Sequence, residues 1–498
     1  MDVLQNLATG FATALTLKNL YLAFVGCLWG TVVGVLPGIG PVAGITLLIP
    51  ATYGIDATGA IIMMAGIYYG AMYGGSTTSI LMNIPGESAS VITCLDGYQM
   101  ALKGRGGAAL FIAAFGSWVG GTLSVIGLML MAPMLAEFAT KFGPPEMFAI
   151  YLLAFLLLSS IGQDFFTTMP MVLLGLLLAS IGMDPLTGVL RFTHGVKHLY
   201  DGLGFVPVAM GAFGMGEILA ATQESAEGRK VQKVRLRDLL PTREEFRASL
   251  GPIWRGTGIG FFVGLLPGSA HIVSSFLSYL VEKRISKHPE RFGKGAIEGV
   301  AGPETANNAA SGAAMIPFLG LGIPTGPPAA VMMIALLIHG VRPGPLFISE
   351  QPGVFWGLIA SMYIGNVILL VLNLPLVSVF VTLLRVPFRL LFPIILLICL
   401  VGTFSVNLDT FELIVLLGAG ILGYAFRCWG FEIAPMILAL ILGPAAEISF
   451  RQSLMRSGGS FAIFLHSPIA LTLILVGCGL LAWNIYRSLQ PQPAPAQG

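Results

Sequence analysis

A duplicated, helix-breaking phrase is the feature that most constrains the fold of this chain. Gly30-Thr-Val-Val-Gly-Val-Leu-Pro-Gly-Ile-Gly40 in the first half is echoed by Gly260-Phe-Phe-Val-Gly-Leu-Leu-Pro-Gly-Ser269 in the second. Each copy is followed, some fifty residues later, by a second broken phrase, Asn83-Ile-Pro-Gly-Glu-Ser88 or Gly322-Ile-Pro-Thr-Gly-Pro327. Matching breaks in the hydrophobic segments of two halves are typical of carriers and indicate where the substrate binds.

Composition places the chain in a lipid bilayer. Of its 498 residues, 55% are hydrophobic and only 10% are charged, against about 25% charged in soluble domains. Apolar runs near the roughly 20 residues that cross a bilayer recur along the whole chain. Because backbone groups in lipid must be paired internally, these runs predict an all-α polytopic membrane protein. With the broken segments, we count about eleven to fourteen membrane-entering helices.

Charge and motif content exclude several function classes. A net charge of +2 without a basic, aromatic-rich domain gives no indication of nucleic-acid binding. The five cysteines are scattered and unpaired in sequence, which predicts neither disulfides nor a transition-metal site. The chain has no nucleotide-binding motif, which argues against an ATP-driven pump. We therefore expect no cofactor.

Two basic segments, 224–255 and 282–295, flank the second copy of the duplicated phrase. Basic loops remain on the cytoplasmic side of a membrane. Residues 256–281 would then leave and return to one face, as a re-entrant hairpin turning at Leu266-Pro267-Gly268. Its two arms of about 12 residues would each be roughly 18 Å long. The alternative is a kinked full span, with one loop opposing the charge bias.

Equivalent landmarks predict two homologous repeats. Pro37 and Pro267 are 230 residues apart, Pro85 and Pro324 are 239 apart, and Gly104 and Gly340 are 236 apart. We expect inverted repeats, the common arrangement in carriers with broken helices. The predicted organisation is a first transport repeat at 1–223, a basic cytoplasmic linker at 224–255, a second repeat with C-terminal scaffold helices at 256–486, and a disordered tail at 487–498.

The second broken phrase of each half, with its flanking residues, carries a candidate substrate site. Free N–H groups at the start of a half-helix suit carboxylates, whereas freed carbonyl and hydroxyl oxygens suit Na⁺. Two alternatives remain: the small residues allow close helix packing, and the amides join helices by hydrogen bonds. The candidate substrate-binding residues are Ser76, Thr77, Thr78, Ser79, Asn83, Gly86, Ser88, Asn307, Asn308, Thr325 and Gly326.

Acidic residues and backbone at the breaks are candidates for a cation site. Ionisable residues at membrane depth are functional candidates by default, and Asp96 is one of them because it follows the first broken phrase. The alternative for the glutamates is a role as helix caps or first-turn acids. The candidate residues for Na⁺ or H⁺ are Pro37, Gly38, Gly40, Pro267, Gly268, Ser269, Glu87 and Glu304.

At these phrases the chain resembles the large membrane subunit of the tripartite tricarboxylate transporter family. The resemblance rests on Gly34–Pro41, Tyr68–Ser76, Asn83–Ser88, Asp96–Tyr98, Phe292–Gly299, Pro303–Ala309, Leu321–Pro324 and Gly340–Pro345. It spans most of the chain. One departure is Pro324-Thr-Gly-Pro-Pro328, where many members have Pro-Gly-Ser.

The resemblance implies a secondary carrier in the bacterial inner membrane. Such carriers work with a periplasmic solute-binding protein and a small membrane subunit of about four helices. The binding protein delivers a carboxylate such as citrate, and a Na⁺ or H⁺ gradient drives its uptake. The chain would then be no enzyme.

Other classes of protein predict different behaviour. A polar-pore channel would conduct without a binding protein, and another type of secondary carrier would transport small solutes without one. A membrane-embedded enzyme would need a nucleophile, for which Ser88 is the least implausible residue. We expect cation-coupled carboxylate import by alternating access.

Overall fold

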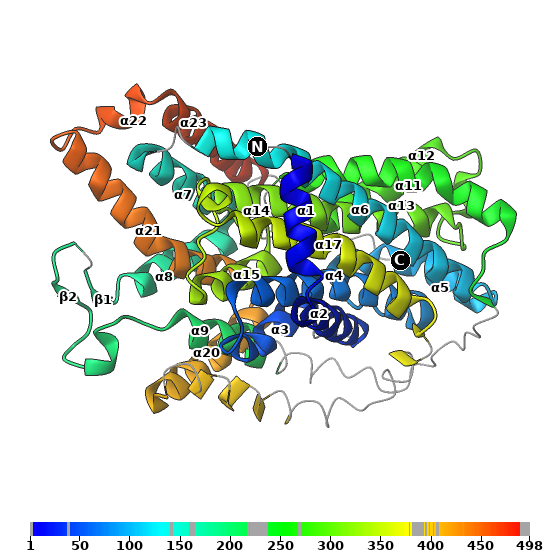
Figure 1. The fold of residues 1–498 in the computed structure, drawn as a ribbon, viewed down its shortest axis with the longest axis horizontal. Helices are drawn as coiled ribbons and strands as arrows, with labels where there is room; N and C mark the ends of the chain where they lie inside the picture. Colours follow the sequence, from blue (N-terminus) through cyan, green and yellow to red (C-terminus); the bar gives the residue numbers. More distant parts are fainter. Residues whose placement is uncertain are drawn as a thin grey trace. The chain divides into compact units, whose positions relative to one another are not determined.

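The computed structural model describes most of the chain and divides it into two units. The described residues are 3–36, 40–139, 143–158, 165–184, 186–216, 219, 238–266, 270–377, 379–380, 393, 396–397, 399–401, 403–404, 408–431 and 433–488. Unit 1 comprises residues 1–140 and 209–424, and unit 2 comprises residues 141–208 and 425–498. Helices dominate both units (Figure 1). This confirms the predicted all-α polytopic class.

Unit 1 contains both copies of the duplicated phrase. Its α-helices are α1 (Val3–Ala14), α2 (Leu17–Val35), α3 (Gly40–Leu48), α4 (Ala57–Met82), α5 (Thr93–Leu102), α6 (Gly106–Ala139), α11 (Arg243–Gly264), α12 (Ala270–Ile285), α13 (Glu298–Ala313), α14 (Met315–Leu321), α15 (Pro327–Ile338), α16 (Phe347–Glu350) and α17 (Pro352–Asn373). Short helices η1 (Pro50–Thr52), η2 (Ser88–Val91) and η6 (Pro289–Arg291) and a π-helical turn, η4 (Met210–Met215), lie between them.

Unit 2 is smaller. It contains α7 (Pro144–Leu158), α8 (Phe165–Ala179), η3 (Lys197–Leu199), α21 (Ala434–Arg456), α22 (Ala462–His466) and α23 (Pro468–Ser488). Its strands β1 (Gly182–Met183) and β2 (Leu190–Arg191) pair antiparallel, with Gly182 opposite Arg191. Two helices, α9 (Phe205–Ala209) and α20 (Thr410–Cys428), lie across the boundaries of the units.

Glycines spaced by four residues bring the paired helices of each repeat into backbone contact. In α2, Gly26, Gly30 and Gly34 face Met63, Ile67 and Ala71 of α4. In α11, Gly256, Gly260 and Gly264 face Gly302, Ala306 and Ala310 of α13. A Cβ at any of the six glycines would collide with a backbone carbonyl oxygen of the facing helix. The two sets are related by the offsets 230 and 239 that relate the proline landmarks. The structure therefore contains the two predicted repeats.

The breaks in the two repeats also share their backbone geometry. Asn83 ends α4 at φ 57°, and Gly322 ends α14 at φ 70°, so both helices stop in the left-handed region. This region favours Gly and Asn. Gly104 and Gly340, at φ 75° and 72°, end α5 and α15 in the same manner.

The second copy of the phrase forms a helical hairpin. Helices α11 and α12 pack together, and the Arg255 guanidinium bridges them by donating to both Glu282 carboxylate oxygens, at 2.8 and 2.6 Å. The expected arms of about 12 residues were too short, since α11 has 22 residues and α12 has 16. Helix α11 begins earlier because Thr242 is its N-cap and forms a capping box with Glu245 in the first turn. In Figure 1, α11, α12 and α13 lie together.

The two repeats pack reciprocally around two central helices. The break after α4, with η2 and α5, packs against α13, and η2 also packs against α12. The matching helix of the second repeat, α15, packs against α3 and α4. Helix α4 is buried along residues 59–82 and α13 along residues 299–313. The core of unit 1 therefore lies where the repeats meet.

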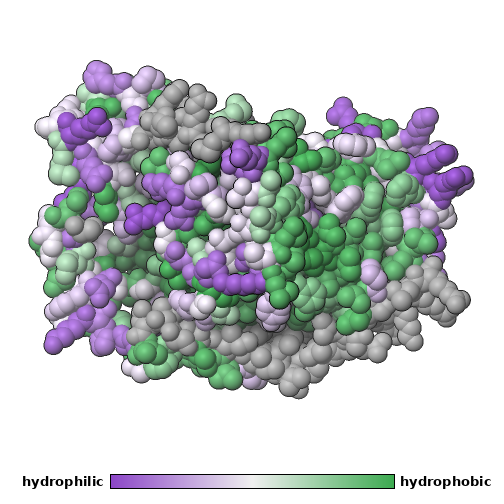
Figure 2. Space-filling model, in the orientation of Figure 1, coloured by the Kyte–Doolittle hydropathy of each residue, from purple (hydrophilic) through white to green (hydrophobic). Residues whose placement is uncertain are grey.

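Five helices in the described residues are long and apolar enough to cross a membrane. They are Leu17–Val35, Gly106–Met131, Pro352–Asn373, Thr410–Cys428 and Pro435–Arg456. Large apolar side chains on them are exposed, such as Val367 and Val371 of α17. Figure 2 shows a broad, continuous hydrophobic area on one face of the molecule. An area of this size fits contact with lipid.

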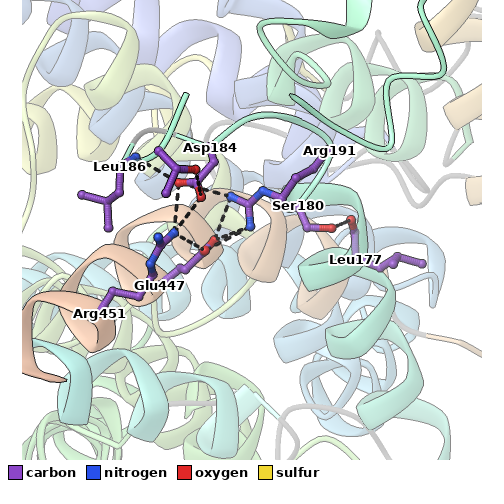
Figure 3. A network of polar contacts seen from close by, with 8 residues as sticks. Leu177, Ser180, Asp184, Leu186, Arg191, Glu447 and Arg451 are labelled. Carbon is purple, nitrogen blue, oxygen red and sulfur yellow. Dashed lines mark hydrogen bonds and ion pairs between the residues drawn. The ribbon is translucent and has the colours of Figure 1, made fainter. Parts of the chain in front are cut away.

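A network of four charged residues holds the β1–β2 ribbon of unit 2 to α21 (Figure 3). Arg451 donates to both Asp184 oxygens at 3.0 and 2.8 Å, and Arg191 donates to Glu447 at 3.0 Å. Asp184 also accepts from the Thr187 hydroxyl at 2.7 Å. Its pKa lies well below the usual range because the Thr187 hydroxyl, the Arg451 guanidinium and the Leu186 N–H all donate to its carboxylate. Asp184 and Arg191 lie outside the apolar helices, whereas Glu447 and Arg451 lie in the last turns of the candidate span Pro435–Arg456.

Candidate functional site

A polar row on the buried helix α13 forms the second repeat's side of the candidate site. Glu304, Asn307 and Asn308 are each 1% exposed. They follow Pro303 on a helix otherwise made largely of Ala and Gly, so polar side chains are the main groups that reach beyond its backbone. Spacings of three and four residues place them along one face of the helix.

The first repeat contributes Glu87, which caps the short helix η2. The break at Asn83 ends α4 and leaves the next helical turn with free N–H groups. Glu87 Oε2 accepts from the Ala89 N–H at 2.7 Å, and its Oε1 accepts from Asn307 Nδ2 at 3.1 Å. The contact between Glu87 and Asn307 joins the first repeat to the second. Glu87 therefore caps η2, and it is also a buried acid in contact with the second repeat.

Glu304 and Asn308 also bond to the first repeat. The Thr93 hydroxyl, at the start of α5, donates to Glu304 Oε1. Asn308 Nδ2 donates to the Ser117 hydroxyl of α6 at 2.7 Å and to the Glu304 carbonyl at 3.1 Å. The structure thus brings together three of the predicted residues of α13 with Glu87.

Several acceptor atoms in this cluster have no partner. Within the described residues, Glu304 Oε2, Asn307 Oδ1 and Asn308 Oδ1 are buried and accept no hydrogen bond. Neither Glu87 nor Glu304 forms an ion pair with a described Lys or Arg. A buried polar atom without a partner costs about 1–3 kcal/mol, and an unpaired buried charge costs more. The cluster therefore has spare capacity for a positive ligand.

The four hydroxyl residues near the end of α4 are buried. The hydroxyls of Ser76, Thr78 and Ser79 donate to carbonyls three or four residues earlier, at 2.7, 3.1 and 3.0 Å. Ser79 also lies 2.9 Å from the Ser90 hydroxyl. Thr77 is 2% exposed. Because these protons are used within the helix, the hydroxyl oxygens have mainly lone pairs to offer, which suits a cation better than an anion.

The other described candidates lie at or beside the breaks between helices. Asn83 and Ser88 are exposed, and Gly86 packs closely against Gly34 and Gly75. The buried residues Thr325 and Gly326 lie just before α15, and Gly40 starts α3 at φ 65°. The candidate tip residues Pro37, Gly38, Pro267, Gly268 and Ser269 fall outside the described residues.

Asp96 joins the repeats at a neighbouring position. Its Oδ1 accepts from the Gly295 and Ala296 N–H groups at 2.7 and 2.8 Å, and its Oδ2 accepts from the Tyr279 hydroxyl at 2.9 Å. The side chain is 0% exposed. With three donors on its two oxygens, Asp96 holds the segment just before α13 against α5.

Sequence reasoning missed Thr93, Ser117 and Tyr279. Ser and Thr are frequent in membrane helices, where they often bond their own backbone, so neither residue type is a distinguishing signal. Tyr279 lies in the hairpin arm, where an amphipathic ring is expected near an interface.

These observations define a class: a polytopic membrane protein with two repeats, whose broken helices enclose a buried, oxygen-rich cluster. The model of the Tripartite tricarboxylate transporter TctA family matches residues 20–438. The chain therefore belongs to this family, whose members are the large membrane subunits of tripartite transport systems.

One relative matches the chain over nearly its full length, and a second matches less than half of it. An uncharacterized 52.8 kDa protein in the TAR-I ttuC' 3' region of Agrobacterium vitis is 47% identical over 491 residues, which is 98% of both chains. An uncharacterized protein in the TAR-II ttuC' 3' region of the same organism is 46% identical over 225 residues, covering 45% of this chain and 93% of its own length. No solved structure matches the chain.

Proposed function

We propose that this chain is the permease subunit of a binding-protein-dependent, cation-coupled secondary transporter that imports tricarboxylates or related carboxylates. The hydrogen bond between Glu87 and Asn307 carries the proposal, since it joins the acidic break of one repeat to the amide pair of the other. Carriers with broken helices bind substrate and coupling ion at the interface of their repeats. The chain would act as a carrier and not as an enzyme.

The proposed partners follow from the family. A periplasmic solute-binding protein would capture the carboxylate and deliver it, and a small membrane subunit of about four helices would complete the complex. The complex would reside in the bacterial inner membrane. Membership of a family of tripartite systems supports this assembly.

The proposed mechanism is alternating access. Because the site takes residues from both repeats, a relative movement of the repeats would open and close it. Coupling requires that the cation bind the loaded state better than the empty state. The acids Glu87 and Glu304 would supply the charge that attracts the cation, while amide N–H groups and backbone at the breaks would contact the carboxylate.

Uptake of radiolabelled citrate into proteoliposomes tests the proposal. The vesicles would contain both membrane subunits, and the binding protein would be added outside under an imposed Na⁺ or proton gradient. Uptake should require the binding protein and the gradient. In Asn307→Ala with Asn308→Ala, it should fall at least about tenfold, because hydrogen bonds to charged groups contribute about 1.5–3 kcal/mol each and 1.4 kcal/mol is a tenfold change.

Thr305→Val is the matched control. Thr305 lies beside Glu304 on α13, is buried, and bonds only the Ala301 carbonyl of its own helix in the described hydrogen bonds. Valine keeps its shape, so uptake should remain near wild type. Normal uptake and normal cation dependence in the double variant would refute the site. Unitary currents without the binding protein would indicate a channel instead.

A further inference from the structure

Three unpartnered oxygens on α13 point to a more specific assignment. Glu304 Oε2, Asn307 Oδ1 and Asn308 Oδ1 are buried and accept no hydrogen bond from any described residue. Their residues occupy positions i, i+3 and i+4 of one helix, on side chains that are each 1% exposed. Natural metal sites on helices use this spacing for side chains that share one ion.

The neighbours of the two amides determine which of their atoms are free. Asn308 Nδ2 lies 3.1 Å from the Glu304 carbonyl oxygen, which can only accept a hydrogen bond. Asn307 Nδ2 lies 3.1 Å from the Glu87 carboxylate. Both NH₂ groups are therefore turned toward acceptors, and both amide oxygens are left without donors.

The chemistry of the three atoms favours a metal cation over a proton. A proton on Glu304 would occupy one oxygen and could be donated to one more, so at least one amide oxygen would stay unpaired. A water molecule could bridge two oxygens, but it would leave the buried carboxylate charge uncompensated. A hard monovalent cation accepts several oxygen ligands and also neutralises that charge.

We propose that Glu304, Asn307 and Asn308 coordinate a dehydrated monovalent metal cation, with Na⁺ as the reference ion. The proposal rests on the proposed cation-coupled function and assigns the two amide oxygens to the cation rather than to the carboxylate substrate. Glu87 is then a positioning residue, which turns the Asn307 amide so that its oxygen is free for the ion. The ion would lie where the two repeats meet, so its binding would stabilise one arrangement of the repeats.

Direct binding of ²²Na⁺ to the full-length chain in lipid nanodiscs tests this site. The assay would use no substrate, no binding protein and no small subunit, with choline chloride keeping the ionic strength constant. Wild type should bind ²²Na⁺ saturably. Glu304→Gln and Asn308→Ala should each weaken binding at least about tenfold, because each removes a charge or a ligand. Thr305→Val, beside them on α13, should bind as wild type does.

Two measurements keep the result interpretable. Gel filtration and thermal unfolding in choline chloride show whether each variant is folded. If Glu304→Gln is not folded, Asn308→Ala becomes the deciding variant. Undiminished ²²Na⁺ binding in the folded deciding variant would overturn the site. So would absence of saturable binding to wild type.

The uptake and binding assays together distinguish failure of this cation site from failure of the proposed function. Wild-type proteoliposomes that take up citrate under a proton gradient without binding ²²Na⁺ would overturn this site and leave carboxylate import standing. Saturable ²²Na⁺ binding that Glu304→Gln abolishes, in a protein that transports no carboxylate, would support the site and reject the function.

Discussion

Buried acids in this protein differ in how completely their oxygens are used. Asp96 accepts from three donors, whereas Glu304 has an oxygen without a donor among the described residues. A satisfied carboxylate stabilises a structure, and an unsatisfied one has capacity for a ligand. Asp96 is therefore a structural residue, although its place beside a broken phrase made it a functional candidate in sequence.

Asp96→Ala tests that role. It would leave the Gly295 and Ala296 N–H groups and the Tyr279 hydroxyl without their acceptor. Asp96→Asn is the matched control, since its amide oxygen can accept from both N–H groups and its NH₂ can donate to Tyr279. In thermal unfolding of the purified protein, Asp96→Ala should lower the free energy of unfolding by about 1–3 kcal/mol more than Asp96→Asn does. Equal stability of the two variants would contradict the role.

The ionic network of unit 2 gives a pH-dependent prediction. The Thr187 hydroxyl and Arg451 guanidinium lower the pKa of Asp184 in the folded protein. A lowered pKa contributes stability above the unfolded value of about 4, and that stability is lost as pH falls through the folded value. Wild type should therefore unfold at a higher temperature than Asp184→Asn between pH 5 and 8, and the difference should shrink below about pH 4.

Thermal unfolding of both proteins across this range provides the measurement. Thr187→Val removes one donor to Asp184 and keeps the ion pair with Arg451. Its unfolding temperature should therefore differ less from that of wild type in the same acid range. If the difference in unfolding temperature between wild type and Asp184→Asn stays constant down to pH 3, the carboxylate charge does not contribute to stability.

At the scale of elements, the helix pairs of the two repeats are constrained by their glycines. Gly260→Ala would place a Cβ against the Ala306 backbone and separate α11 from α13. The free energy of unfolding should fall by about 1–3 kcal/mol as a result. Gly258→Ala is the control, because no atom lies within 4 Å of its Cβ position; it should be neutral or stabilise by up to about 1 kcal/mol. Thermal unfolding of both variants decides. Gly260→Ala as stable as Gly258→Ala would disprove close packing.

The hairpin was predictable, but its length was not. Charge bias and two Leu-Pro-Gly phrases indicated a turn, because backbone breaks and basic loops leave strong sequence signals. The arms are longer because α11 begins with the charged turn after Thr242, which hydropathy assigns to a loop. The capping box there was a visible signal for the true start.

The candidate site was predictable only in part. Asn307 and Glu304 were conspicuous because polar residues are rare in apolar segments. Their partners, Thr93 and Ser117, come from the other repeat, and no local pattern specifies which helices meet across 190 or more residues. Tertiary packing alone makes those pairs.

At the scale of the whole molecule, the two repeats are equivalent in geometry and different in chemistry. The offset of 239 residues relates Asn307 and Asn308 to Tyr68 and Tyr69 of α4. The two asparagines therefore have aromatic counterparts, and Glu304 has Ala65 as its counterpart. The cluster lies on one repeat's helix, and the other repeat supplies its partners. Each hairpin nevertheless has a bond between its arms: Arg255 to Glu282 in the second and Trp29 Nε1 to the Gly44 carbonyl, at 3.0 Å, in the first.

These hairpins make the expected inverted arrangement testable. Both ends of a hairpin lie on one membrane face, so in a cysteine-free background Arg243→Cys and Lys287→Cys should react with an impermeant maleimide from the cytoplasmic side. Inverted repeats require Leu15→Cys and Gly54→Cys, which flank the α2–α3 hairpin, to react from the periplasmic side. All four positions are exposed in the structure. Labelling in intact cells and in inside-out vesicles provides the comparison. Reaction of all four from the cytoplasmic side would instead establish parallel repeats, and the two breaks would then enter the membrane from the same face.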